Sequence, residues 1–434
     1  MRRALMLTLL AVLCLLTHGP PAVAFENPQG LRHRADTGGV PDRRGVELIT
    51  ADTLRKHVTA LASDTFEGRE AGTRGGRAAG AYLIDHLRRR GFTPGGPGGD
   101  YEQPFGRGYR NILVRWPGRD PHRRDEYVVV GAHYDHVGYG RADNSNGPIG
   151  YIHNGADDNA SGTAGLLAAI DAFAALDEPP ARSVLFAFWD GEEQGLLGSE
   201  HWVENPTVPL DDVRLFVNAD MIGRLRDETV EVSGLRTGAG LRQFVCEQNS
   251  TIGLRLTFDW SIRRDSDHYP FYRKRIPFVM LHTGKHSDYH RPSDDVERLN
   301  LPGAERVARL LFRVVQAAAA AEDLPVFRDE VSREDAGLKQ RLEAGLAEPP
   351  SRPLRLGISW RRDAGEPGSV ILSRIVGGSP AARAGLRVGD RVYAVNGRRF
   401  QSSDQFRELV RAGEELDLTF ERQGRIGRAT LTFD

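Results

Sequence analysis

The sequence predicts an α/β fold: a mostly parallel central sheet with helices on both faces, followed by a small mainly-β domain. Two observations support this. Apolar strands alternate with amphipathic helices along residues 127–321, the pattern of parallel sheets. Residues 354–434 instead show short strands around a single helix. The length of 434 residues accommodates two such domains.

The elements of the larger domain follow from hydrophobic periodicity. Leu54, Val58 and Leu61 recur at helical spacing, and Gly91 ends the second amphipathic helix. Continuous apolar runs of five to seven residues predict buried strands. In chain order we expect helices at 50–62 and 77–90, strand 127–132, helix 160–176, strand 183–189, helix 196–204, strand 215–219, helix 240–248, strand 277–282 and helix 304–321.

The elements of the tail are shorter. We expect strands at 370–375, 391–395, 416–421 and 429–433, and a helix at 403–411. Asn396-Gly397 is typical of a tight turn. Residues 323–353 combine a charged stretch with a proline-rich one and predict a linker.

The N-terminus predicts export. Arg2 and Arg3 precede an apolar run that is too short to span a bilayer, and small residues ending at Ala24 suggest a cleavage site. We therefore expect a signal peptide at 1–24, a flexible lead at 25–48, a larger folded domain at 49–322 and a periplasmic or extracellular protein. The sequence leaves the export route open. Cys14 would leave with the signal, so Cys246 has no partner for an intramolecular disulfide. The net charge of −1 gives no electrostatic basis for binding nucleic acid.

Polar residues gather where the predicted strands end. They occur in the segments AHYDHVG, NGADDNASG, FWDGEEQG, VNADMIG and SDYHRPSDD. Because ligands bind beyond the carboxyl ends of parallel strands, we expect these side chains to meet at one edge of the sheet. The candidates are His133, Asp158, Glu192, Glu193, Asp220 and His290.

These residue types are those of a hydrolase with two metal ions, in which one carboxylate bridges the ions. We expect Asp158 to bridge, His133 and Asp220 to complete one site, and Glu193 and His290 to complete the other. Glu192 is then the general base. Imidazoles and carboxylates suit two zinc ions, with cobalt or manganese possible.

Further residues receive weaker assignments. Asp135 is expected to orient His133, and Tyr289 to stabilise the reaction intermediate. Asp267 and His268 are expected to line the substrate pocket. Three other histidines, His136, His153 and His201, are interpreted as structural.

With these segments, residues 50–322 resemble the secreted aminopeptidase family with two co-catalytic zinc ions, which includes bacterial leucine-type aminopeptidases and relatives of glutamate carboxypeptidase. The resemblance implies the same ligand set, with Glu192 as the base, and a cis peptide after Asp158. It also implies a peptide substrate with a free N-terminus.

The tail resembles a PDZ domain. The segment SPAARAGLRVGDRVYAVNG carries the likeness, and Leu356, Gly357 and Ile358 resemble the loop that holds a peptide C-terminus before the edge strand. A C-terminal peptide is therefore a possible ligand.

Three alternatives stay open at this stage. One is a carboxypeptidase or dipeptidase, in which Arg263-Arg264 or Arg273-Lys274-Arg275 would hold the substrate carboxylate. Another is a relative of the glutaminyl cyclases. The last is a PDZ-based binding protein with a vestigial catalytic domain.

Overall fold

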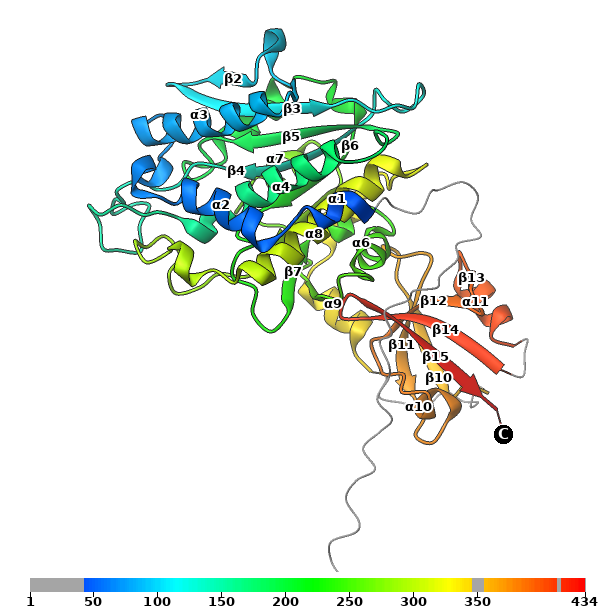
Figure 1. Cartoon of the computed structure of the whole chain (residues 1–434). Coiled ribbons are helices and arrows are strands. Elements are labelled where there is room, and N and C mark those ends of the chain that lie inside the picture. The colour runs from blue at the N-terminus through cyan, green and yellow to red at the C-terminus, as the bar shows by residue number, and fades with distance from the viewer. Residues whose placement is uncertain (1–42, 346–354, 412–414, 434) are drawn as a thin grey trace, which may run out of the picture.

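A computed structural model describes residues 43–345, 355–411 and 415–433. The expected signal peptide, most of the expected lead and part of the expected linker lie outside these ranges. The larger domain is built on a nine-stranded sheet in the described chain (Figure 1). Four parallel strands form its centre, and their spatial order is β5 (Ser183–Trp189), β4 (Tyr127–His133), β6 (Val213–Ala219) and β9 (Phe278–His282).

The edges of this sheet are mixed. On one side β3 (Tyr109–Trp116) runs antiparallel to β5 and pairs with β1 (Thr93–Pro94) and β2 (Glu102–Phe105). On the other side β7 (Thr229–Ser233) runs antiparallel to β9 and parallel to β8 (Arg255–Phe258). The α/β class and the parallel centre are as predicted, whereas these edge strands are additions to the prediction.

Helices cover both faces, as alternation along β4 shows. Val128 and Val130 pack with α2 (Ala51–Leu61), α4 (Gly162–Ala174) and α8 (Leu301–Ala320) on one face. Val129 packs with α5 (Leu197–Glu204) and α7 (His268–Arg273) on the other. Figure 1 shows α1 (Arg43–Glu47), α2, α4 and α8 together on the first of these faces.

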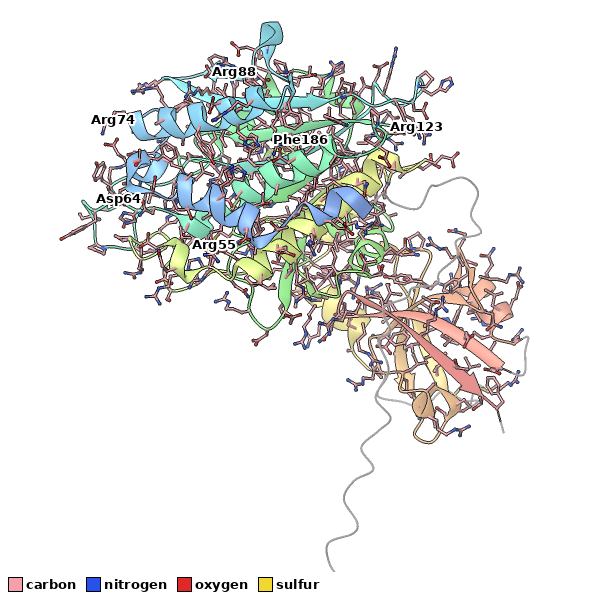
Figure 2. All side chains as sticks on the ribbon, viewed as in Figure 1. Arg55, Asp64, Arg74, Arg88, Arg123 and Phe186 are labelled. Carbon is pink, nitrogen blue, oxygen red and sulfur yellow. The ribbon has the colours of Figure 1, made fainter. Side chains whose placement is uncertain are left out.

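The N-terminal helices begin where side chains cap them. Thr50 accepts a hydrogen bond from Thr53 N and starts α2, and Thr73 accepts one from Gly76 N and starts α3 (Arg74–Arg89). Figure 2 shows Arg74 and Arg88 on the outer surface and Phe186 inside the body of the domain. Helix α6 (Leu241–Asn249) packs into the same core as α8.

The tail folds around its own apolar core and a six-stranded sheet in the described residues. The main path runs β10 (Ile358–Arg362), β11 (Val370–Ile375), β12 (Arg391–Val395), β14 (Glu415–Arg422) and β15 (Arg425–Thr432), and β13 (Arg398–Arg399) pairs with β12. Helices α10 (Pro380–Arg383) and α11 (Ser403–Leu409) complete it. The predicted strands are present, and β10 lies at the sheet edge beyond the Leu356-Gly357-Ile358 loop.

The two domains touch through buried charges. The carboxylate of Glu366 in the tail accepts hydrogen bonds from the backbone N–H groups of Arg242 (2.9 Å) and Gln243 (3.3 Å), the first turn of α6. The Arg242 guanidinium lies 2.8 Å from Glu421 on β14. Leu256 N donates to Gln423 O at 2.8 Å. The tail is therefore docked on the surface formed by α6 and β8.

The expected linker has structure of its own between the domains. Helix α9 spans Ala336–Glu343, and Arg236 pairs both with Glu334 in the linker and with Asp363 in the tail. Across the described residues, no helix is long and apolar enough to cross a membrane.

Candidate metal centre and substrate pocket

The six candidate residues converge at the carboxyl edge of the parallel strands. His133 ends β4, Glu192 and Glu193 follow β5, and Asp220 follows β6. The remaining two come from loops: Asp158 from the turn before α4, and His290 from the segment after β9. The strand register therefore brings together residues up to 157 positions apart, from 133 to 290.

Asp158 lies between two imidazoles. Its Oδ1 is 3.4 Å from His133 Nε2, and its Oδ2 is 3.1 Å from His290 Nε2. Asp220 Oδ1 is 3.4 Å from His133 Nε2 on one side, and Glu193 Oε2 is 3.0 Å from His290 Nε2 on the other. The two expected ligand groups thus share the Asp158 carboxylate.

The nitrogen and oxygen atoms of these side chains are oriented toward shared points in space and form few directed hydrogen bonds with one another. His290 Nε2 and Asp220 Oδ1 are buried, and neither makes a well-directed hydrogen bond within the described chain despite these short separations. Ligands about 2.0–2.2 Å from a tetrahedral zinc ion lie roughly 3.3 Å from each other, which matches the separations found. The geometry fits a pair of divalent cations.

The electrostatic environment also favours cations. Burial acts to raise the pKa of Asp158, but the imidazoles of His133 and His290 outweigh it and hold that pKa well below its usual range. Burial, with the charges of Glu193, Asp267 and Asp220, raises the pKa of Glu192 well above its usual range. Five carboxyl groups therefore lie close enough to affect one another in a buried space, those of Asp158, Glu192, Glu193, Asp220 and Asp267.

Asp135 contacts the residues that follow β5 as well as His133 at the end of β4. Its carboxylate accepts from the backbone N–H of Glu192 at 3.1 Å and of Glu193 at 3.3 Å. Its Oδ1 is 3.7 Å from His133 Nδ1, and its own backbone carbonyl is nearer at 3.2 Å. Asp135 thus fixes the glutamate pair directly, while the closer acceptor for the His133 ring is a carbonyl.

The sequence favours a structural role for His136, but in the structure it lies beside two of the candidate metal ligands. Its Nδ1 lies 2.8 Å from Glu193 Oε1 and 3.9 Å from Asp158 Oδ2. The signal in the sequence was its position three residues after His133, within the same segment. By contrast, His153 bonds Ser145 and His201 stacks on Phe105, and neither belongs to a group of possible metal ligands among the described residues.

The turn that carries Asp158 is held from several directions. The Asp158–Asn159 peptide is cis, as the resemblance implied. Asp294 Oδ2 accepts from the backbone N–H groups of Asp157 (3.0 Å) and Asp158 (3.1 Å). The fully buried Arg69 donates to the carbonyls of Asn154 and Gly155 just before the turn.

His290 is fixed by the loop opposite. It adopts a left-handed backbone conformation with φ 52°, which costs a residue other than glycine about 1 kcal/mol. Asn146 N donates to His290 O at 2.9 Å, and His290 Nδ1 lies 2.8 Å from Asn144 O. These contacts set the direction of the imidazole.

A cavity of about 150 Å³ adjoins the ligand atoms. Five of the six candidate residues line it: His133, Asp158, Glu192, Glu193 and Asp220. Most of its remaining wall was not expected from the sequence, and much of this wall comes from β7, β9 and the segment after β8. The wall is mostly polar: Met221, Glu231, Ser233, Asp259, Ser261, Arg263, Asp265, His268, Met280, His282, Lys285 and Tyr289.

Of the three residues expected to contact the substrate or the intermediate, two line this cavity and one does not. His268 and Tyr289 line this cavity, and the Tyr289 ring stacks on His290 at 3.9 Å. Asp267 does not line it, which corrects the expectation. Its carboxylate is buried against α5, where it accepts from Ser199 Oγ at 2.5 Å, because the backbone turns it away from the cavity side.

Comparison with known proteins gives two family matches. Residues 111–315 match peptidase family M28, and residues 371–422 match the PDZ domain. The chain is 26% identical over 280 residues to leupeptin-inactivating enzyme 1 of Streptomyces exfoliatus, covering 62% of this chain and 57% of the relative. It is 27% identical over 213 residues to aminopeptidase YwaD of Bacillus subtilis, covering 47% and 43%. The chain therefore spans about half the length of these relatives.

Solved structures share the fold. The Legionella pneumophila LapA aminopeptidase superposes with a TM-score of 0.53 at 19% identity, covering 67% of this chain and 79% of that one. The glutaminyl cyclase of Porphyromonas gingivalis superposes with a TM-score of 0.51 at 21% identity, covering 62% and 99%. At these identities the likeness extends to the fold alone.

Proposed function

We propose that this protein is an exported aminopeptidase that uses two zinc ions, since residues 111–315 match peptidase family M28 and residues 371–422 match the PDZ domain. The observation that carries the proposal is the placement of Asp158 between His133 and His290, with one carboxylate oxygen toward each imidazole. The name of one relative, aminopeptidase YwaD of Bacillus subtilis, supports the same activity.

Two ligand groups would hold the ions. His133 and Asp220 lie on one side of Asp158, and Glu193 and His290 lie on the other. Bound divalent ions would polarise the scissile carbonyl and lower the pKa of the attacking water. Cobalt or manganese would suit the same donors less specifically.

Glu192 is the proposed general base. Its backbone N–H is held by Asp135, and its side chain lines the cavity beside His133. Its carboxylate would take the proton from the attacking water and transfer it to the leaving amine. Tyr289, at the cavity wall, would donate its hydroxyl to the oxygen that becomes negatively charged.

The test uses residues 25–434 and a panel of aminoacyl-nitroanilides with free or blocked N-termini. We expect cleavage of the free-amine substrates alone, loss of activity on chelation and its recovery with zinc. Cleavage of blocked substrates would contradict the aminopeptidase proposal. No cleavage despite stoichiometric metal would point to the carboxypeptidase or cyclase alternatives, and no cleavage without metal to the binding-protein alternative.

One observation bears on the carboxypeptidase alternative. Arg263 lines the cavity, where a cation would be needed to hold a substrate carboxylate. Its guanidinium, however, lies 2.9 Å from Asp259 Oδ2, and Arg264 lies 3.1 Å from Glu200. Since both guanidinium groups already have carboxylate partners, the aminopeptidase remains our proposal.

For the PDZ domain we propose a peptide ligand that adds a strand to β10. The strand lies at the sheet edge, and Gly357 in the preceding loop has φ 74°. Trp360 Nε1 on β10 donates to Ser403 Oγ on α11 at 2.8 Å, so the indole spans strand and helix as one wall of the proposed groove. Fluorescence titration with peptides ending in a free or amidated carboxylate would test this, and equal binding of both would contradict it.

A further inference from the structure

A second cluster of metal-type side chains lies outside the catalytic centre. It joins the N-terminal helices to the helix that follows Asp158. His57 lies on α2, His86 on α3 and Asp171 on α4. One nitrogen or oxygen from each residue lies within 4.8 Å of the others. None of the three lines the substrate cavity.

This cluster is distant from the first. Helix α4 begins at Gly162, near Asp158, and Asp171 is nine residues further along. At 1.5 Å per residue this corresponds to about 14 Å of helix. An ion at this cluster would therefore be separate from those at the catalytic centre.

The distances suit a small cation. His86 Nε2 lies 3.3 Å from Asp171 Oδ1, the separation expected for two ligands about 2.0–2.1 Å from one tetrahedral zinc ion. The rings of His57 and His86 are nearly perpendicular at 87°, with centroids 4.9 Å apart. Two imidazoles that ligate one ion through ring nitrogens would have centroids roughly 5 Å apart.

The surrounding contacts orient these side chains. His57 Nδ1 lies 2.8 Å from the Tyr82 hydroxyl, so Nε2 is the ring nitrogen that remains available to bind a metal ion. Arg90 Nη2 lies 2.9 Å from Asp171 Oδ2, the carboxylate oxygen that does not face His86. Such outer contacts are typical of metal ligands, whose second polar atom is usually fixed by a neighbour.

The location permits exchange with solvent. His57 is buried, with 2% of its surface exposed, while the side chains of His86 and Asp171 keep 14% and 10%. We propose that His57, His86 and Asp171 form a zinc site, separate from the catalytic centre, that ties α2, α3 and α4 together. Helices α2 and α3 flank Arg69, so the ion would also stabilise the support of the Asp158 turn.

The test counts ions in tag-free protein and does not depend on activity. Asp158→Asn, which removes the shared catalytic ligand, serves as the background, and zinc per chain is measured after dialysis. Adding His86→Asn should lower the content by about one ion per chain, as should Asp171→Asn. Adding His122→Asn, at an exposed histidine, should leave it unchanged.

Thermal unfolding gives the second readout. Zinc should raise the midpoint of the Asp158→Asn protein, and the rise should disappear with His86→Asn. Equal zinc content with and without His86→Asn and Asp171→Asn would overturn the proposal. So would a loss of stability in these variants without any loss of zinc, since the cluster would then be a hydrogen-bonded contact between helices. Zinc content and the thermal midpoint can both be measured even if the protein proves to have no peptidase activity, so failure of the proposed function and failure of this proposal can be told apart.

Discussion

His136 Nδ1 lies 2.8 Å from Glu193 Oε1, while Glu193 Oε2 lies 3.0 Å from His290 Nε2. The two oxygens of one carboxylate are therefore divided between a histidine that orients it and a histidine that would share a metal ion with it. We therefore expect His136 to position the Glu193 carboxylate for the metal site proposed at Glu193 and His290.

His136→Asn should weaken zinc binding at the Glu193 and His290 side by about 10–100-fold, because contacts that orient metal ligands contribute that much. Competition with a chromophoric chelator measures the effect, which should appear for one ion and spare the other. His122→Asn is the matched control. Unchanged affinity for both ions would show that His136 serves packing alone.

Glu192→Gln should lower kcat by at least about 10²-fold and leave the metal content unchanged, because the amide is nearly isosteric but cannot accept the proton. Zinc analysis beside steady-state kinetics separates the two properties. Asp158→Asn should instead lose both activity and the zinc of the catalytic centre. Near-normal turnover of Glu192→Gln would assign the base to another residue.

Arg69→Met should destabilise the catalytic domain by at least about 3 kcal/mol. The buried guanidinium donates to the backbone carbonyls of Leu61, Tyr134, Asn154 and Gly155, and each unsatisfied buried carbonyl costs about 1–3 kcal/mol. Chemical denaturation measures the loss. Arg74→Met, at a side chain 82% exposed, is the control and should change little.

Much of the candidate site could be predicted from the sequence, because most of the candidate ligand residues lie at or directly after the end of an apolar strand, or in a turn rich in Gly and Asn. The buried runs that became β4 and β5 have no polar interruption, so both their limits and the position of His133 could be predicted. Strands β7 and β8 alternate between buried and more exposed residues, unlike the continuous apolar runs from which the other strands of this sheet were predicted. The cavity wall that they support was missed with them.

Contacts between segments far apart in the sequence could not be predicted, because local sequence does not show which residues meet. Arg242 and Glu421 are 179 residues apart, and nothing in either local sequence distinguishes a buried ion pair from two solvated charges. The orientation of Asp267 shows the same limit. Its neighbour His268 faces the cavity, yet the turn that starts α7 directs the aspartate toward Ser199. Only the packed structure decides which of two adjacent polar residues reaches the site.

The domain contact at Glu366 should make stability depend on pH. Burial raises the pKa of Glu366 to about 7, against the opposing effects of Arg391 and of the N–H groups at the start of α6. Between its ordinary pKa of 4.5 and about 7 the folded protein keeps a proton that the unfolded chain releases. The contribution of Glu366 to the free energy of unfolding therefore falls as pH rises through this window, by about 3 kcal/mol.

Glu366→Gln should flatten this dependence, because the amide stays neutral and its oxygen can still accept from Arg242 N. Urea unfolding at intervals from pH 5 to pH 8 measures the slope. Glu330→Gln, at an exposed glutamate, should retain the wild-type slope. If stability in the Glu366→Gln variant fell with pH as steeply as in the wild type, the titrating group would lie elsewhere.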